Sequence, residues 1–280
     1  MSKLSAGQAI RFAKDILNAA KHYSEFANPT TVPKPIWGKE VSRYLQRLDI
    51  YNAKIVRSLL LSCAKYRKKD MLLVVKACET LTIRHSIISG RRSNELEKAY
   101  ATIARELHDS EIDIWTLLSE QLTPYAQTDR QVQENFVLYS SERVSKKWRT
   151  VLICLNEYIS TGETSVNDSR EVEIEHILPQ KPSKRVIKEV GLDLKELSEY
   201  ARKIGNLTLL SEKLNRSASN SPFSEKRRAL CKSEIALNKE ICEWDSSIWG
   251  AEEIETRSRL LAERATLVWQ WPPRKSEAKE

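Results

Sequence analysis

Acidic and basic side chains gather in two neighbouring stretches in the C-terminal half of this 280-residue chain. Residues 163–175 hold five acidic residues and one arginine, and residues 201–239 hold nine Lys or Arg against three acidic residues. Carboxylates of the first stretch could bind a metal ion, and cations of the second could bind phosphate. Charge alone leaves a second interpretation open, in which the two stretches are adjacent solvated faces.

Short structural elements must position these charges. Residues 171–175 alternate acidic and apolar side chains, which predicts a strand with one solvated face, and Pro179 ends it. A second apolar run spans residues 204–210. Ser221 and Pro222 predict a helix start, with serine as the N-cap and proline at the first helical position. The predicted order is strand, connection, strand, loop and helix.

The ordered motifs of this region resemble a known nuclease family. They are Glu-His-Ile-Leu-Pro-Gln at 175–180, Gly-Asn-Leu-Thr-Leu-Leu at 205–210, Leu-Asn at 214–215, and Ser-Asn-x-x-Phe-x-x-Lys at 219–226. The set resembles HNH endonucleases of the ββα-metal type, and more narrowly the C-terminal nuclease domain of GmrSD-type modification-dependent restriction endonucleases. The resemblance covers about residues 165–272. A closing pattern agrees with it: Trp244, Ile248, Arg257, Leu260 and Trp269.

The resemblance implies roles for individual residues. His176 is the implied general base, and Asn206 is the implied middle Asn, which holds the loop and orients the His176 ring. Glu175 and Asn215 are the implied metal ligands, and their oxygen atoms favour Mg²⁺ or Mn²⁺ over zinc. Many HNH enzymes have Asp where this chain has Glu175, so Glu173 stays an alternative ligand. The implied contacts to DNA come from Lys213, Arg216, Asn220 and Lys226.

Glu175 and His176 are consecutive, and this constrains the site. Adjacent residues of a strand point to opposite faces. The two side chains can therefore address one phosphate only where the strand ends or bends, which Pro179 and the following loop permit. The ordinary pKa of histidine near neutrality leaves much of the imidazole free to act as a base.

The N-terminal part is expected to be a helical domain over residues 1–160, followed by an HNH nuclease domain over 161–280. The polar segment 161–169 is the expected linker. Gly90 is expected to end a buried helix, and Asn94 to cap the next one. Apolar periodicity predicts helical stretches at 6–26, 39–67, 69–88, 95–108, 111–122, 129–141 and 142–159. The predicted fold class is mainly α, with a helical N-terminal region and a small ββα-metal core surrounded by helices.

Composition narrows the protein class. The chain has seven glycines, which favours helices over tight turns, and no apolar run long enough to span a membrane. The N-terminus does not resemble a signal peptide. The five cysteines of the chain are scattered without a CxxC pair, which argues against a disulfide scaffold or a four-cysteine zinc site. This use of cysteine favours the reducing cytoplasm as the compartment. The net charge of +8 weakly favours an anionic partner.

The family resemblance implies a metal-dependent endonuclease that hydrolyses DNA, acting in phage restriction. The chain contains neither a P-loop nor the Asp-Gly-Gln-Gln-Arg motif of the nucleotide-hydrolysing domain in the resembled enzymes. A sensor or NTPase subunit, or an N-terminal domain of a longer protein, is therefore an expected partner. One alternative is a non-catalytic DNA-binding or partner-docking module with a degenerate HNH centre, and a weaker one is an RNA-cleaving toxin.

Overall fold

The computed structural model describes residues 5–30, 36–140, 145–160, 172–218 and 220–273. Its contacts divide the chain into two compact units: unit 1 comprises residues 1–127 and 269–280, and unit 2 comprises residues 128–268. The boundary predicted near residue 160 lies inside unit 2. There, α7 (Asp129–Leu138) and α8 (Lys146–Ile159) both pack against α14 (Ala251–Val268). The expected linker at 161–169 lies outside the described residues.

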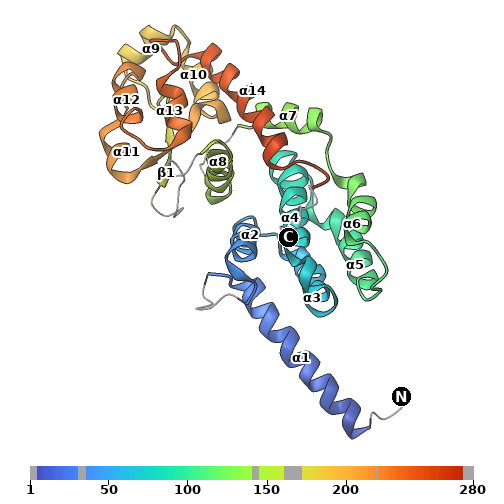
Figure 1. The fold of residues 1–280 in the computed structure, drawn as a ribbon. Helices are drawn as coiled ribbons and strands as arrows, with labels where there is room; N and C mark the ends of the chain where they lie inside the picture. Colours follow the sequence, from blue (N-terminus) through green and yellow to red (C-terminus); the bar gives the residue numbers. More distant parts are fainter. Residues whose placement is uncertain (1–4, 31–35, 141–144, 161–171, 219, 274–280) are drawn as a thin grey trace. The chain divides into compact units, whose positions relative to one another are not determined.

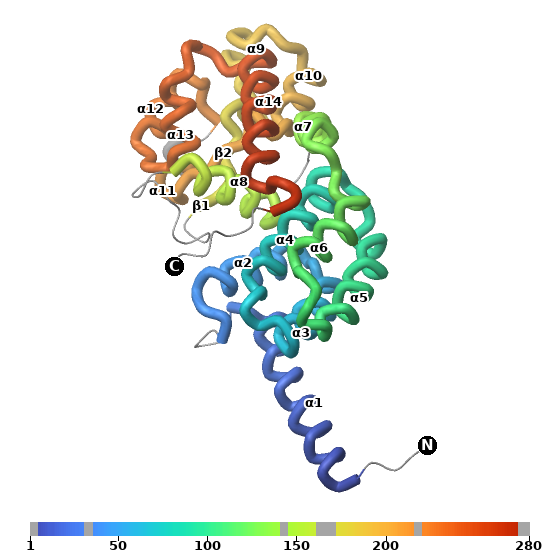
Figure 2. The backbone as a smooth tube through the Cα atoms, turned by 45° about the vertical axis from the view of Figure 1, so that its right-hand side comes forward, coloured from blue at the N-terminus to red at the C-terminus, as the bar shows by residue number. Residues whose placement is uncertain are grey.

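All regular secondary structure in the described part of unit 1 is helical. Its α-helices are α1 (Ala6–Ala27), α2 (Gly38–Ile50), α3 (Arg57–Tyr66), α4 (Met71–Leu81), α5 (Glu97–Glu106) and α6 (Ile114–Leu122). α4 packs on α2 and α3 packs on α5, around a core of aliphatic side chains (Figure 1). The N-terminal part of α1 extends away from the other helices of the unit, whereas its C-terminal part packs against α3 (Figure 2). The apolar residues Ile10, Ile16 and Leu17 of α1 are exposed.

Some predicted helices of unit 1 are interrupted. The stretch predicted at 39–67 breaks between α2 and α3, where Asn52 has a φ of 60°, a left-handed conformation that asparagine tolerates better than most residues. The stretch predicted at 69–88 continues from α4 as a π-helix over Thr82–Ile88, and Gly90 follows with a φ of 64°. Asn94 does not cap α5, because it lies within a 3₁₀ turn over Ser93–Leu96.

Unit 2 contains a two-stranded antiparallel sheet surrounded by helices. β1 (Val172–His176) pairs with β2 (Leu207–Ser211), and His176 lies opposite Leu207. Besides α7, α8 and α14, the helices of the unit are α9 (Lys184–Val190), α10 (Leu194–Ala201), α11 (Glu212–Ala218), α12 (Phe223–Leu230) and α13 (Ala236–Cys242). α8 and α13 pack on β2, and α11 contacts both strands (Figure 2). The described chain thus has the predicted mainly helical fold class.

The helices that follow β2 differ in detail from the prediction. α11 follows β2 directly, so a helix rather than a loop carries Asn215. The next helix, α12, begins at Phe223 with Pro222 as its N-cap, not Ser221, and no side chain caps it. The N-cap prediction was wrong because the proline ring occupies the position before the first helical residue.

α14 holds the start of β2 in place through hydrogen bonds to its backbone. The guanidinium of buried Arg257 donates to the carbonyl oxygens of Gly205 at 2.8 Å and Leu207 at 2.7 Å. The hydroxyl of Ser258 accepts from the backbone N–H of Gly205 at 3.0 Å. These bonds satisfy backbone groups that would otherwise be buried without partners. α14 therefore sets the position of the residue after Gly205, which is Asn206.

Cys231 and Cys242 form a disulfide that the sequence analysis did not predict. Packing of α12 against α13 brings the two Cα atoms to 5.5 Å, a proximity that the sequence spacing does not reveal. Cys63, Cys78 and Cys154 are buried, and none of them takes part in a disulfide among the described residues. No helix in the described part of the chain is both long and apolar enough to cross a membrane.

Candidate active site

The end of β1 opens into a pocket with a volume of about 300 Å³. Glu175 and His176 both line this pocket although they are adjacent, because His176 is the last residue of the strand. α11 supplies Asn215, and α12 supplies Lys226. The complete lining is Glu175, His176, Pro179, Gln180, Asn215, Asn220 and Lys226. Residues as far apart in the sequence as Glu175 and Lys226, which are 51 positions apart, thus meet at one place.

Asn206 holds the chain that follows His176. Its side-chain oxygen accepts from the backbone N–H of Leu178 at 2.6 Å, and its amide nitrogen donates to the carbonyls of Leu178 at 2.9 Å and Ala201 at 3.0 Å. Both amide hydrogens are used, so neither is available for the His176 ring. The fully buried side chain of Asn206 therefore holds the backbone two residues beyond His176 and makes no bond to the ring.

His176 sits in a partly buried environment that keeps its imidazole neutral. Burial lowers the pKa of His176 to about 4, and the nearby charge of Lys226 acts in the same direction. Ile177 and Leu178, which follow it, are 1% and 2% exposed and anchor the end of the strand in the core. At neutral pH the ring is therefore unprotonated, which is the form from which a general base acts.

Glu175 is paired with a lysine. The ammonium of Lys226 donates to the Glu175 carboxylate and to the carbonyl oxygen of His176, the latter at 2.5 Å. Burial raises the pKa of Glu175, and the charge of Lys226 opposes this rise. Burial likewise lowers the pKa of Lys226, and Glu175 opposes that change. The two groups therefore stabilise each other's charged forms in a site that is largely removed from water.

Asn215 has a defined orientation. Its amide nitrogen donates to the Glu173 carboxylate at 3.0 Å, and its oxygen accepts no hydrogen bond from the residues that the structure describes. A carboxylate oxygen of Glu175 and an amide oxygen of Asn215 are donors that fit a hard divalent cation such as Mg²⁺. Among the described residues, no three His, Cys, Asp or Glu side chains gather as a metal-binding group. A cation held by only these two protein oxygens would keep several water ligands.

The residues expected to contact DNA lie in different environments. Lys213 is exposed on α11, and Asn220 is exposed at the rim of the pocket. Arg216 belongs to α11, but its side chain lies outside the described residues. Lys226 differs from the expected surface position, because its side chain is 2% exposed. Gln180 also lines the pocket. It is the last residue of the first motif, but no function was predicted for it from the sequence.

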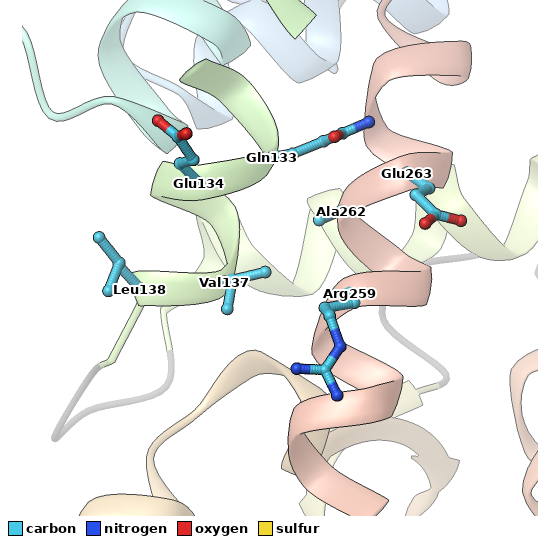
Figure 3. A pocket seen from close by; sticks show the side chains of 7 residues that line it. All are labelled: Gln133, Glu134, Val137, Leu138, Arg259, Ala262 and Glu263. Carbon is cyan, nitrogen blue, oxygen red and sulfur yellow. The ribbon is translucent and has the colours of Figure 1, made fainter. Parts of the chain in front are cut away.

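A second pocket of unit 2 lies between α7 and α14, with a volume of about 450 Å³. Figure 3 shows Gln133 reaching from α7 toward α14, with Val137 and Ala262 nearby. None of the motif residues and no histidine lines it, although two carboxylates, Glu134 and Glu263, do. The pocket at the end of β1 is therefore the candidate active site.

The fold and the pocket define a mainly helical domain whose antiparallel strand pair and following helix present a histidine, carboxylates and amides. Residues 126–264, just under half of the chain, match the family described as GmrSD restriction endonucleases, C-terminal domain. The match begins close to the start of unit 2, and it confirms the resemblance that the motifs indicate. It supports a nuclease of the restriction-endonuclease type. No curated protein and no solved structure matches the chain.

Proposed function

We propose that unit 2 is an HNH endonuclease that hydrolyses phosphodiester bonds of DNA with Mg²⁺ or Mn²⁺, as the nuclease part of a phage-restriction system. The observation that carries this proposal is the meeting of His176, Glu175 and Asn215 around one pocket. Hydrolysis needs a base for the attacking water and positive charge on the phosphate. The pocket offers residues suited to both tasks.

In the proposed reaction His176 accepts a proton from water, and its low pKa keeps the ring neutral for this step. Glu175 and Asn215 would hold the divalent cation, which, when bound, stabilises the negative charge on the phosphate and on the leaving oxygen. Asn206 fixes the backbone after His176, so that the ring keeps its place in the pocket. The exposed Lys213 and Asn220 are proposed to contact the DNA backbone.

The proposed NTP-dependent sensor is a separate protein or domain, because residues 1–280 contain neither a P-loop nor an Asp-Gly-Gln-Gln-Arg motif. Unit 1 contains none of the residues proposed for hydrolysis. Cleavage of plain DNA and cleavage restrained by a modification sensor are both compatible with the pocket. The substrate range is therefore tested separately from the chemistry.

The test is cleavage of supercoiled plasmid with Mg²⁺ or Mn²⁺, beside an EDTA control and the variant His176→Ala. The proposal predicts nicking or linearisation that both controls abolish. RNA in place of plasmid tests the RNA-cleaving alternative. Cleavage that persists in EDTA, or that His176→Ala does not alter, would contradict the proposal. A titration with the divalent cation, followed by calorimetry, separates the proposed nuclease from the alternative of a degenerate HNH centre. A degenerate centre would bind no divalent cation.

A further inference from the structure

Lys226 occupies a position where a helix normally presents an apolar side chain. α12 places Phe223, Lys226 and Leu230 at helical spacing, and all three side chains are buried. Lysine is rarely buried to this extent unless its charge is paired. A lysine that contacts the DNA backbone needs its ammonium at the surface. The burial of Lys226 therefore indicates an internal role.

The contacts of Lys226 identify what it holds. Its ammonium donates to the carboxylate of Glu175 and, at 2.5 Å, to the backbone carbonyl of His176. These acceptors belong to consecutive residues at the end of β1. The ammonium of Lys226 thus connects the side chain of Glu175 and the backbone of His176 to α12.

We propose that Lys226 is a positioning residue that fixes the Glu175 carboxylate and the His176 backbone in the pocket, and that it does not contact DNA. The inference rests on the proposed function of this pocket. Groups that hold the ligands or bases of a site restrict their rotation and set their charge. Lys226 does both for Glu175, and its second bond limits movement of the strand end that carries the His176 ring.

Burial alone does not distinguish a positioning residue from an ion pair that only stabilises the fold away from the active site. The pair of Lys226 and Glu175 is different, because both residues line the same pocket as His176 and Asn215. Lys213 offers a matched comparison within the chain. It lies on the neighbouring helix α11, and it is exposed where Lys226 is buried.

The first arm of the test measures DNA affinity in EDTA over a range of salt concentrations for the whole chain. Each phosphate that a protein neutralises contributes about −0.9 to the slope of log K against log salt. Lys226→Met is expected to leave the wild-type slope unchanged, while Lys213→Ala serves as the exposed-lysine control. A slope reduced by about 0.9 in Lys226→Met would overturn the proposal, because it would mean that the ammonium neutralises a phosphate.

The second arm measures the single-turnover rate of DNA cleavage by Lys226→Arg. Arginine keeps the charge, so a phosphate contact would tolerate it, whereas a planar guanidinium does not replace a compact ammonium between two fixed acceptors. The expected result is a rate lowered by roughly 10- to 100-fold at unchanged DNA affinity. A wild-type rate would overturn the proposal. If the wild-type protein itself cleaves no substrate, the proposed function fails, whereas the first arm still tests where the ammonium acts.

Folding is controlled with a second variant. Lys226→Met leaves the Glu175 carboxylate buried without its partner, which destabilises the pocket. If Lys226→Met does not unfold cooperatively, the double variant Glu175→Gln/Lys226→Met, which removes both charges, replaces it in the first arm. An unchanged salt slope in the double variant supports the proposal, and a reduced slope overturns it.

Discussion

The side chain of Asn206 bonds to both backbone polar groups of Leu178, with its oxygen 2.6 Å from the nitrogen and its nitrogen 2.9 Å from the oxygen. This clamp joins the turn before β2 to the turn after β1. Because β1 ends at His176, two residues before Leu178, the clamp fixes the exit of the strand at the pocket. The asparagine of the second motif thus supports the histidine of the first.

Asn206→Asp tests the clamp. The aspartate keeps an oxygen for the N–H of Leu178 but presents a second oxygen to the carbonyls of Leu178 and Ala201, where a donor is needed. Each buried acceptor left unsatisfied costs about 1–3 kcal/mol. We expect the free energy of unfolding to fall by at least about 2 kcal/mol in urea titrations. An unchanged midpoint and slope would show that the clamp does not stabilise the fold.

Gly205→Ala tests the support from α14. A Cβ at Gly205 would lie 2.0 Å from the carbonyl oxygen of Ile254 and 2.8 Å from the backbone nitrogen of Ser258. Backbone atoms of a buried helix cannot move aside cheaply, so we expect a loss of about 3 kcal/mol or more in unfolding free energy. Gly250→Ala is the matched control, because its closest neighbour would be a Val190 methyl group at 3.4 Å. Equal stability of the two variants would contradict the account of this contact.

The proposed base predicts an unusual pH profile. Hydrolysis requires neutral His176, and its pKa of about 4 means that the ring gains a proton only when the pH falls toward 4. Lowering the pH from 7 to 5.5 should therefore not protonate the base, whereas an unperturbed histidine would lose about half of its neutral form near pH 6.5. The measurement is kcat/KM for plasmid cleavage at saturating Mn²⁺. An acidic limb centred near pH 6.5 would mean that the ring is not shielded as the structure indicates.

The sequence predicted the elements that position the site better than it predicted their contacts. Alternating side chains located β1, and the left-handed Gly90 was recognised as the end of a helix. The break at Asn52 was missed, because apolar periodicity continues across it and only the backbone conformation reveals it.

For the candidate site as well, the sequence predicted the residues better than it predicted their contacts. The motifs identified the residues that line the pocket, because their order is typical of a family, and the family match supports that resemblance. Lys226 was expected to contact DNA, since an isolated lysine in a basic stretch is normally solvated. Its spacing from Phe223 and Leu230 was the available signal, because a lysine on the apolar face of a helix requires a buried partner.

Chemical rescue of His176→Ala by imidazole tests the central claim most directly. The substitution leaves space in a pocket of about 300 Å³, and a free imidazole can serve as a neutral base there. The account predicts that His176→Ala binds DNA with wild-type affinity, does not cleave it, and regains cleavage in proportion to the imidazole concentration. Loss of DNA affinity together with cleavage, or cleavage by His176→Ala at the wild-type rate, would contradict the assignment of His176 as the base.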